Sequence, residues 1–248
     1  MRILALDTST RTASVAVLGG VREVEIDHAV GSHSDDLVAL IDRALADAGL
    51  KLADLDGIAV GAGPGSFTGL RIAMATAKGL CFASALPLWP VSSLAALALD
   101  GVDTLAAADP PEETAEALFV PLIDARRDEV FAGLYRKGGG RVIAVAPDAV
   151  IPVADVAAAV ADALSRTAST RAILLGDTGG SHAAALAAAG EVVAGARTTP
   201  SARSVGRLAA LGDRSDALKV GTPVYIRPSE AEVKFPDGNR GGHRSGKT

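Results

Sequence analysis

Residues 61–72 read Gly61-Ala62-Gly63-Pro64-Gly65-Ser66-Phe67-Thr68-Gly69-Leu70-Arg71-Ile72, between a short apolar run, Gly57–Val60, and a longer one that extends to Leu86. The run before them predicts a buried strand. The Gly-Pro-Gly sequence predicts a turn, because proline fixes φ and glycine tolerates positive φ. Ser66 or Thr68 is expected to cap the helix that follows, Phe67–Ser84. We therefore expect a strand–turn–helix unit whose structural motif is Gly63, Pro64, Gly65, Ser66 and Gly69.

The helix over Phe67–Ser84 carries two charges, Arg71 and Lys78, and is apolar or small at nearly every other position. A helix of this kind must be covered on two sides, and one of the covers is expected to be a partner protein. The alternative is a helix wholly internal to its own lobe. It is too short, and too interrupted by charge and glycine, to span a membrane.

A second helix, Asp35–Ala48, shows an apolar stripe with 3.6-residue spacing. These two helices are the candidates for a protein interface. The candidate partner-binding residues are Leu37, Leu40, Ile41 and Ala44 in the second helix, and Phe67, Leu70, Arg71, Ala73, Met74, Ala77, Lys78 and Cys81 in the first.

Composition limits the classes of function. With 248 residues and 49% hydrophobic content, the chain can bury a sizeable core, as one large domain or two small lobes. A net charge of −5 and only 3% aromatic residues disfavour direct binding of nucleic acid. The single cysteine, Cys81, excludes a disulfide framework and a cysteine zinc cluster. The acidic Asp7 comes too early for a signal peptide, so a cytoplasmic protein is expected.

The remaining patterns predict the same order of elements twice. The first half reads as strands at 3–6, 12–18 and 21–27, a helix at 35–48, a strand at 57–60, a helix at 67–84, a strand at 87–91 and a short helix through Leu99. After an expected loop at 100–116, the second half reads as strands at 117–124, 129–135 and 141–145, a helix at 153–164, a strand at 171–175 and a helix at 181–189.

This repetition predicts a duplicated α/β fold, with mixed sheets and helices on their faces, as in the actin, Hsp70 and sugar kinase group of ribonuclease H-like folds. The first lobe is expected over 1–102 and the second over 117–248. A further helix, 201–212, is expected to cross back onto the first lobe by analogy with that group. Residues 235–248 are expected to be a disordered tail.

Two turns of the predicted fold are candidate phosphate sites. Asp7, Thr8 and Ser9 follow the first strand, and a carboxylate beside hydroxyls suits a hydrated Mg²⁺ and a nucleotide. The alternative is that these side chains satisfy N–H groups of their own turn. The corresponding turn of the second lobe, Asp124–Asp128, lacks a glycine for close backbone approach to phosphate. The P-loop consensus within 241–248 is rejected, because no helix can follow it before the sequence ends.

Four stretches are distinctive: Leu4–Ser9, Gly63–Ile72, Asp124–Tyr135 and Pro223–Arg227. Through them the chain resembles the TsaB family, also called YeaZ, over nearly its whole length. The resemblance implies a non-catalytic scaffold subunit that binds a TsaD-like catalytic subunit, which transfers threonylcarbamoyl to adenosine 37 of tRNA. It also implies a TsaE-like ATPase as a further partner, a homodimer when the chain is alone, and only indirect contact with tRNA. No membrane association and no cofactor are expected, although ATP could be contacted through the complex.

In TsaD a His-x-x-x-His pair follows the strand after the corresponding helix and holds the catalytic metal, since two histidines at i and i+4 can share one ion. Counting from Pro90-Val91 places that pair on Ser93 and Leu97, neither of which replaces an imidazole. No metal site and no catalytic residue are therefore expected. The alternatives are an ATP-dependent small-molecule kinase of the same fold, for which Asp124-Ala125-Arg126 is a poor fit, and a glycopeptidase-like protein, which would need a metal.

Overall fold

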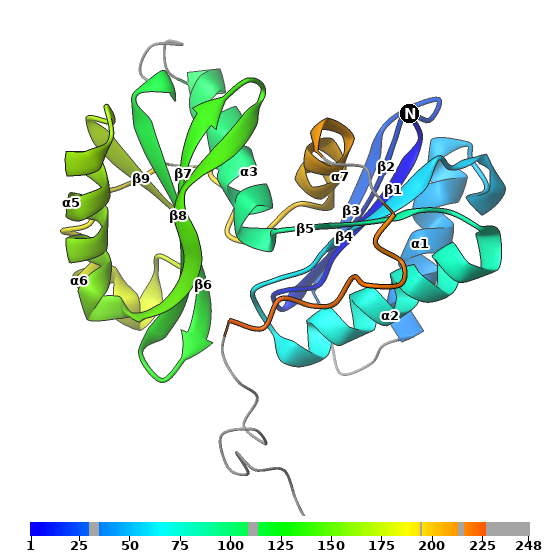
Figure 1. Cartoon of the computed structure of the whole chain (residues 1–248), viewed down its shortest axis with the longest axis horizontal. Helices are drawn as coiled ribbons and strands as arrows, with labels where there is room; N and C mark the ends of the chain where they lie inside the picture. The colour runs from blue at the N-terminus through cyan, green and yellow to red at the C-terminus, as the bar shows by residue number, and fades with distance from the viewer. Residues whose placement is uncertain (30–34, 109–113, 194, 213–215, 227–248) are drawn as a thin grey trace, which may run out of the picture.

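The computed structural model describes residues 1–29, 35–108, 114–193, 195–212 and 216–226. In this part of the chain, each half forms one five-stranded sheet (Figure 1). The strand order of the first sheet is β3-β2-β1-β4-β5, and that of the second is β8-β7-β6-β9-β10. The strands are β1 (Ile3–Asp7), β2 (Thr12–Leu18), β3 (Val24–Ala29), β4 (Gly57–Gly61), β5 (Leu88–Val91), β6 (Ala117–Arg126), β7 (Glu129–Gly138), β8 (Arg141–Pro152), β9 (Arg171–Gly176) and β10 (Glu191–Val192).

Both sheets have the same pairing pattern. In the first, β2 pairs antiparallel with β1 and β3, whereas β4 runs parallel to β1 and β5. In the second, β7 pairs antiparallel with β6 and β8, and β9 runs parallel to β6 and β10. This repetition confirms the expected duplicated α/β fold.

Helices cover both faces of each sheet. The outer faces carry α1 (Asp35–Ala48) and α2 (Phe67–Ser84) on the first sheet, and α5 (Val156–Arg166) and α6 (Ala183–Leu186) on the second. Between the two sheets lie α3 (Ser93–Ala108), which packs on the second sheet, and α7 (Ala202–Leu211), which packs on the first (Figure 1). Single turns of 3₁₀ helix occur at Leu52–Asp54, Val153–Asp155 and Gly180–His182.

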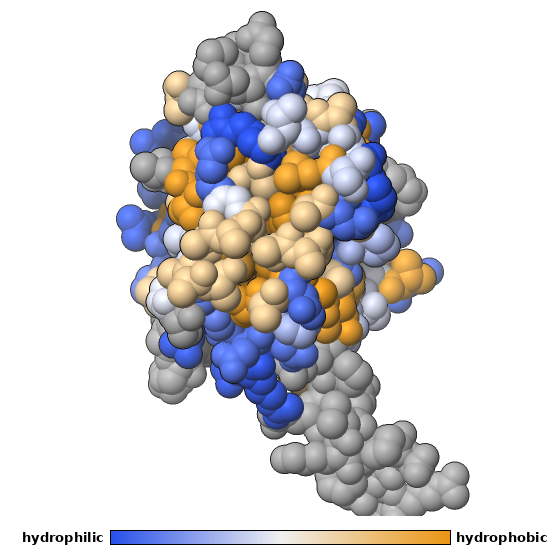
Figure 2. Space-filling view, turned by 90° about the vertical axis from the view of Figure 1, so that its left-hand side faces the viewer, coloured by the Kyte–Doolittle hydropathy of each residue, from blue (hydrophilic) through white to orange (hydrophobic). Residues whose placement is uncertain are grey.

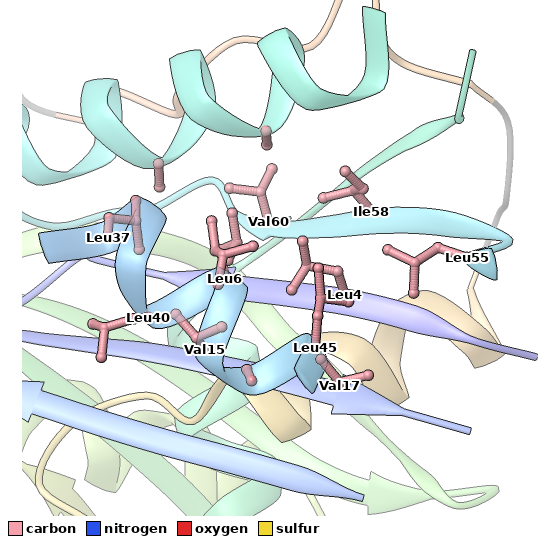
Figure 3. Close-up of a cluster of buried hydrophobic side chains, with 14 of the residues drawn as sticks. Leu4, Leu6, Val15, Val17, Leu37, Leu40, Leu45, Leu55, Ile58 and Val60 are labelled. Atoms are coloured by element: carbon pink, nitrogen blue, oxygen red, sulfur yellow. The ribbon is translucent and has the colours of Figure 1, made fainter. Parts of the chain in front are cut away.

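The alternation of side chains along a strand explains how one sheet supports two cores. Leu4 and Leu6 of β1 face α1 and α2, together with Val15, Val17, Ile58 and Val60 (Figure 3). Ile3 and Ala5 of the same strand face α7 instead. The first sheet is therefore buried on both faces, which accounts for its nearly continuous apolar strands.

The largest difference from the sequence prediction is α3, which continues to Ala108 where a loop was expected from Asp100 onward. Asp100 and Gly101 are poor helix formers. Tertiary contacts keep them helical, because Asp100 bonds to α7, and a side chain at Gly101 would collide with Leu175, 2.3 Å from the Cβ position. Most of α3, including Leu94, Leu97 and Leu105, belongs to the second core, although its beginning was assigned to the first lobe.

Other boundaries also differ. β3 begins at Val24 rather than Val21, because Val21 N donates to Ala48 O at the end of α1 and the Val21 side chain is 90% exposed. β8 extends to Pro152, well beyond Val145, and pairs with β7 on both sides of an irregularity in register around Leu134. The alanine-rich helix expected at 181–189 is α helix only over Ala183–Leu186, and β10 was not expected.

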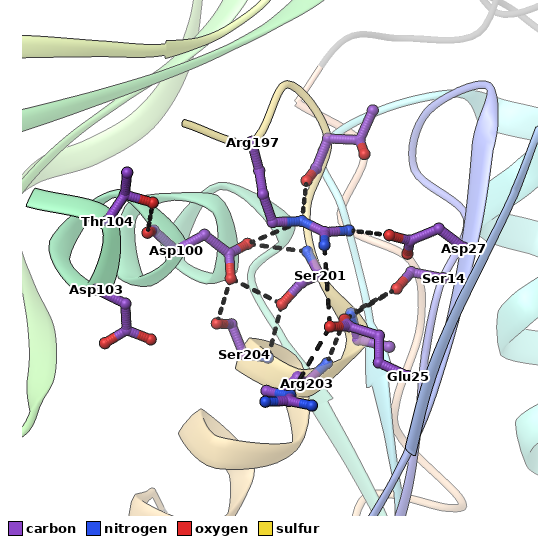
Figure 4. Close-up of polar contacts among 12 residues, drawn as sticks. Ser14, Glu25, Asp27, Asp100, Asp103, Thr104, Arg197, Ser201, Arg203 and Ser204 are labelled. Carbon is purple, nitrogen blue, oxygen red and sulfur yellow. Dashed lines mark hydrogen bonds and ion pairs between the residues drawn. The ribbon is translucent and has the colours of Figure 1, made fainter. Parts of the chain in front are cut away.

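A polar cluster joins the two lobes (Figure 4). Asp100 on α3 accepts hydrogen bonds from Ser201 N at 3.0 Å, Ser201 Oγ at 2.7 Å and Ser204 Oγ at 2.6 Å, all at the start of α7. Arg197 lies beside them, with an ion pair to Asp27 of β3 at 2.7 Å and a longer one to Asp100 at 4.0 Å. The second core helix is thereby tied both to the helix on the first sheet and to the edge of that sheet.

Candidate functional site

The turn before α2 packs directly on the turn after β1. Ser66 N donates to Ser9 O at 2.7 Å, and Thr8 Oγ1 donates to Gly69 O at 2.7 Å. A Cβ on Gly65 would lie 2.3 Å from Ser9 O, and one on Gly69 would lie 2.0 Å from Thr8 O. Glycine at these two motif positions is therefore needed for close backbone approach between the two turns.

Ser66 caps α2, as one of the two alternatives predicted. Its side chain accepts from Gly69 N at 3.4 Å, while its backbone is non-helical. Of the other motif residues, Gly63 has positive φ, and Gly63 and Pro64 are buried where the chain turns from β4. Gly63 O accepts from Ser93 N at 2.8 Å, so the turn also supports the start of α3.

Asp7, Thr8 and Ser9 are buried inside this packing, with exposed fractions of 1%, 5% and 1%. Asp7 accepts from Ser9 N at 2.8 Å, from Ser9 Oγ at 2.6 Å and from Ser93 Oγ at 2.7 Å. Burial raises the pKa of the Asp7 carboxyl, and the hydrogen bonds from Ser9 and Ser93 oppose that shift. The residues considered as nucleotide-facing thus bond to each other and to the α2 motif, which favours the structural alternative.

Ser93 and Leu97, onto which the resemblance would place a metal-binding pair, have other contacts. Ser93 Oγ donates to Asp7, and Leu97 is fully buried in the second apolar core. Across residues 1–29, 35–108, 114–193, 195–212 and 216–226, no group of three or more His, Cys, Asp or Glu side chains is arranged to hold a metal ion.

A second polar cluster spans the two lobes beside this position. Ser92 Oγ, before α3, donates to Asp148 Oδ2 on β8 at 2.8 Å, and Tyr135 OH on β7 donates to Asp148 Oδ1 at 2.5 Å. Burial is the main cause that raises the pKa of both Asp148 and Tyr135. These bonds connect the end of the first sheet to the second sheet.

The turn between β6 and β7 does not resemble a phosphate-binding turn. Arg126, Arg127 and Asp128 all have positive φ and are exposed. Asp124 Oδ1 accepts from Arg126 N at 2.7 Å, and Asp177 Oδ2 accepts from Asp124 N at 2.9 Å. The turn therefore presents arginine side chains to solvent, supported by carboxylates behind them.

Most of the candidate partner-binding residues are interior residues of this chain. Nine of the twelve are buried, with exposed fractions of 9% or less, against the first sheet or at its edge. They are Leu37, Leu40, Ile41, Ala44, Leu70, Ala73, Met74, Ala77 and Cys81. These side chains cannot meet another protein while the lobe is folded, because their own sheet and neighbouring segments cover them.

The outward side of the same helices carries a different set of residues. Phe67 is 37% exposed, Arg71 is exposed and Lys78 is partly exposed. Phe82, 84% exposed, lies on the same line of α2, because spacings of 4, 7 and 4 residues nearly complete whole helical turns. Val38 of α1 is 52% exposed. We call Val38, Phe67, Arg71, Lys78 and Phe82 the α1/α2 outer face.

Sequence reasoning missed Val38, Phe82 and also Tyr225, which contacts α2 from the C-terminal segment. Phe82 lies within the helix predicted over Phe67–Ser84, but no local pattern places it on the outward side of that helix. An aromatic residue fifteen positions after Phe67 was the available signal, in a chain with only five phenylalanines. Nothing local in the sequence brings Tyr225 to α2.

The corresponding outer face of the second lobe is also apolar but chemically different. Figure 2 shows a broad apolar surface on that side of the molecule, over α5 and α6. Its exposed residues include Ala158, Ala161, Ala184, Ala185 and Ala188. Alanine presents little contact area, whereas binding energy concentrates on aromatic and arginine side chains. The α1/α2 outer face is therefore the stronger candidate for a protein interface.

In the part of the chain covered by the structure, no helix combines the length and the apolar character needed to cross a membrane. The expected tail at 235–248, residue Arg227 and the rejected P-loop match lie outside the described residues.

The chain is similar to known proteins along most of its length. The family described as "TsaD: tRNA N6-adenosine threonylcarbamoyltransferase" matches residues 3–204. The "tRNA threonylcarbamoyladenosine biosynthesis protein TsaB" of Bacillus subtilis is 31% identical over 243 residues, which cover 95% of this chain and 98% of that protein. The protein of the same name from Haemophilus influenzae is 39% identical over 132 residues, 53% of this chain and 52% of that protein, so the match spans about half of each.

A solved structure extends the similarity to the fold. The structure of YeaZ from Pseudomonas aeruginosa is 30% identical to this chain and superposes with a TM-score of 0.70. The superposed region covers 90% of this chain and 100% of the YeaZ chain.

Proposed function

Since this chain belongs to the TsaB family, we propose that it acts in the synthesis of threonylcarbamoyladenosine in tRNA as a non-catalytic subunit that binds a TsaD-type transferase. The observation that carries the proposal is the α1/α2 outer face, which presents aromatic and cationic side chains on a helix layer whose inner side is fully packed. In this scheme the chain supplies a binding surface, and the partner supplies the chemistry.

The interface residues of this proposal differ from those suggested by the sequence. Phe67, Arg71 and Lys78 remain, Val38 and Phe82 are added, and the nine buried residues support the helices from within. A stable interface of this kind would bury on the order of 2,000 Å² in total. Phe82 and Val38 provide exposed apolar area, and such area is strongly stabilising when a partner removes it from water.

A non-catalytic role is supported by the residues at the position of the TsaD metal site. Ser93 is used as a donor to Asp7, and Leu97 is a core residue, so neither side chain offers an imidazole. No residue of this chain is assigned to the transfer reaction. The net charge of −5 supports indirect rather than direct contact with tRNA.

Membership of the TsaB family also suggests the other partners of this chain. A TsaE-like ATPase joins the pair, and any contact of this chain with ATP occurs through that complex. In the absence of the transferase, the α1/α2 outer face pairs with the same face of a second copy, since a two-fold interface uses one patch on both subunits. The proposed location is the cytoplasm, where the tRNA substrate is.

Co-purification with the TsaD-type protein of the same organism tests the proposal. Phe82→Glu combined with Val38→Glu is expected to abolish the pair, while circular dichroism and the melting temperature stay unchanged. Val192→Glu is the matched control, because Val192 is 61% exposed on the second lobe and lies outside the proposed surface. Unchanged co-purification of the double variant would reject the α1/α2 outer face as the interface.

A reconstituted reaction tests the non-catalytic role. Formation of threonylcarbamoyladenosine in tRNA is expected to require the transferase and to rise strongly when this chain is added. This chain without the transferase is expected to form no product. Turnover by this chain alone, with ATP or with the complete set of substrates, would show that it is an enzyme in its own right.

A further inference from the structure

Arg71 is held in a defined orientation on the surface of α2. Its guanidinium carbon lies 3.7 Å from the centroid of the Phe67 ring and 5.8 Å from that of the Tyr225 ring. Its Nε donates a hydrogen bond to Tyr225 OH at 3.0 Å, and the two rings are 5.1 Å apart. Stacking on an aromatic face attracts the cation and restricts the long side chain, so less entropy is lost when Arg71 binds something else.

The Tyr225 side of this cluster comes from residues 216–226, which run along the first lobe. Val224 N donates to Ala62 O at 2.7 Å, next to the turn that leads to α2. Asp216 Oδ1 accepts from Leu88 N at 3.0 Å, and Leu218 packs against the first core. These contacts hold residues 216–226 against the first lobe. The segment thereby places Tyr225 against Arg71, although the two residues are 154 positions apart in the sequence.

The guanidinium of Arg71 has no carboxylate partner among the residues that the structure describes. By contrast, Arg166 on α5 has an ion pair to Asp162 at 2.7 Å. Only the Nε of Arg71 is used in a hydrogen bond within the described residues, so both terminal nitrogens of this exposed side chain are available to a further acceptor. A planar, oriented guanidinium of this kind matches the two oxygens of a carboxylate.

We infer that Phe67, Arg71 and Tyr225 form the anchor of the α1/α2 outer face, and that Arg71 receives an Asp or Glu carboxylate of the TsaD-type partner. This inference rests on the proposed function and adds the chemistry that the partner must present. Phe, Tyr and Arg provide large contact area with little rotamer freedom once stacked, and Tyr and Arg are typical of residues that dominate binding energy. It also makes the C-terminal segment a part of the partner surface.

The test is the affinity of purified chain for purified TsaD-type protein, measured by isothermal titration at two salt concentrations. Arg71→Glu is expected to weaken binding about 30-fold or more, the range of a dominant interface residue. Arg71→Lys is expected to weaken it about tenfold, because the charge remains while the planar fork is lost. Tyr225→Phe keeps the ring and removes the acceptor for Arg71 Nε, so a loss of about threefold is expected.

Arg166→Glu is the matched control, since it reverses an exposed arginine on the other lobe and is expected to leave the affinity unchanged. Urea unfolding of each variant shows whether the fold is intact. A charge exchange identifies the acceptor: one partner Asp or Glu changed to Arg is expected to restore binding to Arg71→Glu and to weaken binding to the unchanged chain.

The outcomes separate this inference from the proposed function. If Arg71→Glu binds the partner as well as the unchanged chain does, while Phe82→Glu loses binding, the anchor is rejected and the proposed function stands. If the unchanged chain does not bind the transferase at all, the proposed function itself fails. If Arg71→Glu alters only the association of this chain with itself, the carboxylate belongs to a second copy, and the inference is overturned.

Discussion

Ser201 Oγ donates a hydrogen bond to Asp100 Oδ1 at 2.7 Å, between residues 101 positions apart in the sequence. Asp100 is 8% exposed, and the bond joins α3 in the second core to the first residues of α7 on the first sheet. Ser201 Oγ in turn accepts from Ser204 N at 3.0 Å and so caps α7. One buried carboxylate therefore links the capping of a helix to the packing of two lobes.

Asp100 should make stability depend on pH in a direction that is unusual for an aspartate. Burial raises its pKa from 3.8 to about 6, against the hydrogen bonds from Ser204 and Ser201 and the charge of Arg197. Between these two values the folded chain holds a proton that the unfolded chain has released, so this group stabilises the fold as pH falls from 7 to 5. Relative to Asp100→Asn, the unchanged chain should gain about 1 kcal/mol of unfolding free energy over that interval.

Urea unfolding of both proteins at pH 7 and pH 5 measures this gain. Taking the difference between them removes the contribution of other carboxylates, including Glu25 and Asp27 near Arg197. If the unfolding free energy of the unchanged chain relative to Asp100→Asn were the same at pH 5 as at pH 7, or lower at pH 5, Asp100 would be ionised throughout this range.

Gly61→Ala should destabilise the fold, although alanine has a higher intrinsic propensity for regular secondary structure than glycine. A Cβ at Gly61 would lie 1.9 Å from Asp7 Oδ2 and 2.9 Å from Ser93 Oγ, so the buried hydrogen bonds between them must shift. We expect a loss of about 1–3 kcal/mol, typical of overpacking at a close contact. Equilibrium unfolding in urea measures the loss.

Gly79→Ala is the matched control for that change. Gly79 lies within α2 and has nothing within 4 Å of its Cβ position, so the substitution should stabilise the chain by up to about 1 kcal/mol. Equal effects of the two substitutions would show that the contact around Asp7 is looser than these distances indicate.

Ala77→Arg should unfold the first lobe rather than act only on a partner. Ala77 is fully buried between α2 and the first sheet, and an unpaired buried charge is strongly destabilising. We expect a loss of about 3–5 kcal/mol or an insoluble protein. Ala75→Arg, on the exposed side of the same helix, should leave the melting temperature nearly unchanged. Similar melting temperatures for both variants would contradict this orientation of α2.

Cys81 should be inert towards thiol reagents while the chain is folded. Its side chain is fully buried, and burial, followed by the charge of Asp216, raises the pKa of the thiol to about 12. Because the thiolate is the reactive form, a chromogenic disulfide reagent at pH 8 should react at the rate of unfolding, and fully in urea. Cys81 is the single cysteine in the sequence, so all colour reports this site. Rapid reaction of the folded chain would contradict the burial of Cys81.

Local features of the sequence were enough for much of the architecture. The alternation over Thr12–Leu18, the apolar run at Ile3–Leu6 and the Gly-Pro-Gly turn predicted β2, β1 to within one residue, and the bounds of α2. Ser66 was one of two predicted caps, and the repeated order of elements led to the duplicated fold. These features are readable because turn chemistry, capping and side-chain periodicity act within a few residues of the chain.

The site depended on contacts that no local pattern contains. Nearly every side of α2 is apolar or small, so periodicity could not tell which side the sheet covers; the fold buries Ala77 and Cys81 and exposes Phe82. Likewise α3 continues through Asp100 because Ser201 satisfies the carboxylate, and Arg71 is oriented by Tyr225. The sequence by itself determined most of the strands, the Gly-Pro-Gly turn and the kind of fold, since these follow from neighbouring residues. Only the tertiary structure decided which surface is left for a partner, because that surface is what remains after distant segments have packed together.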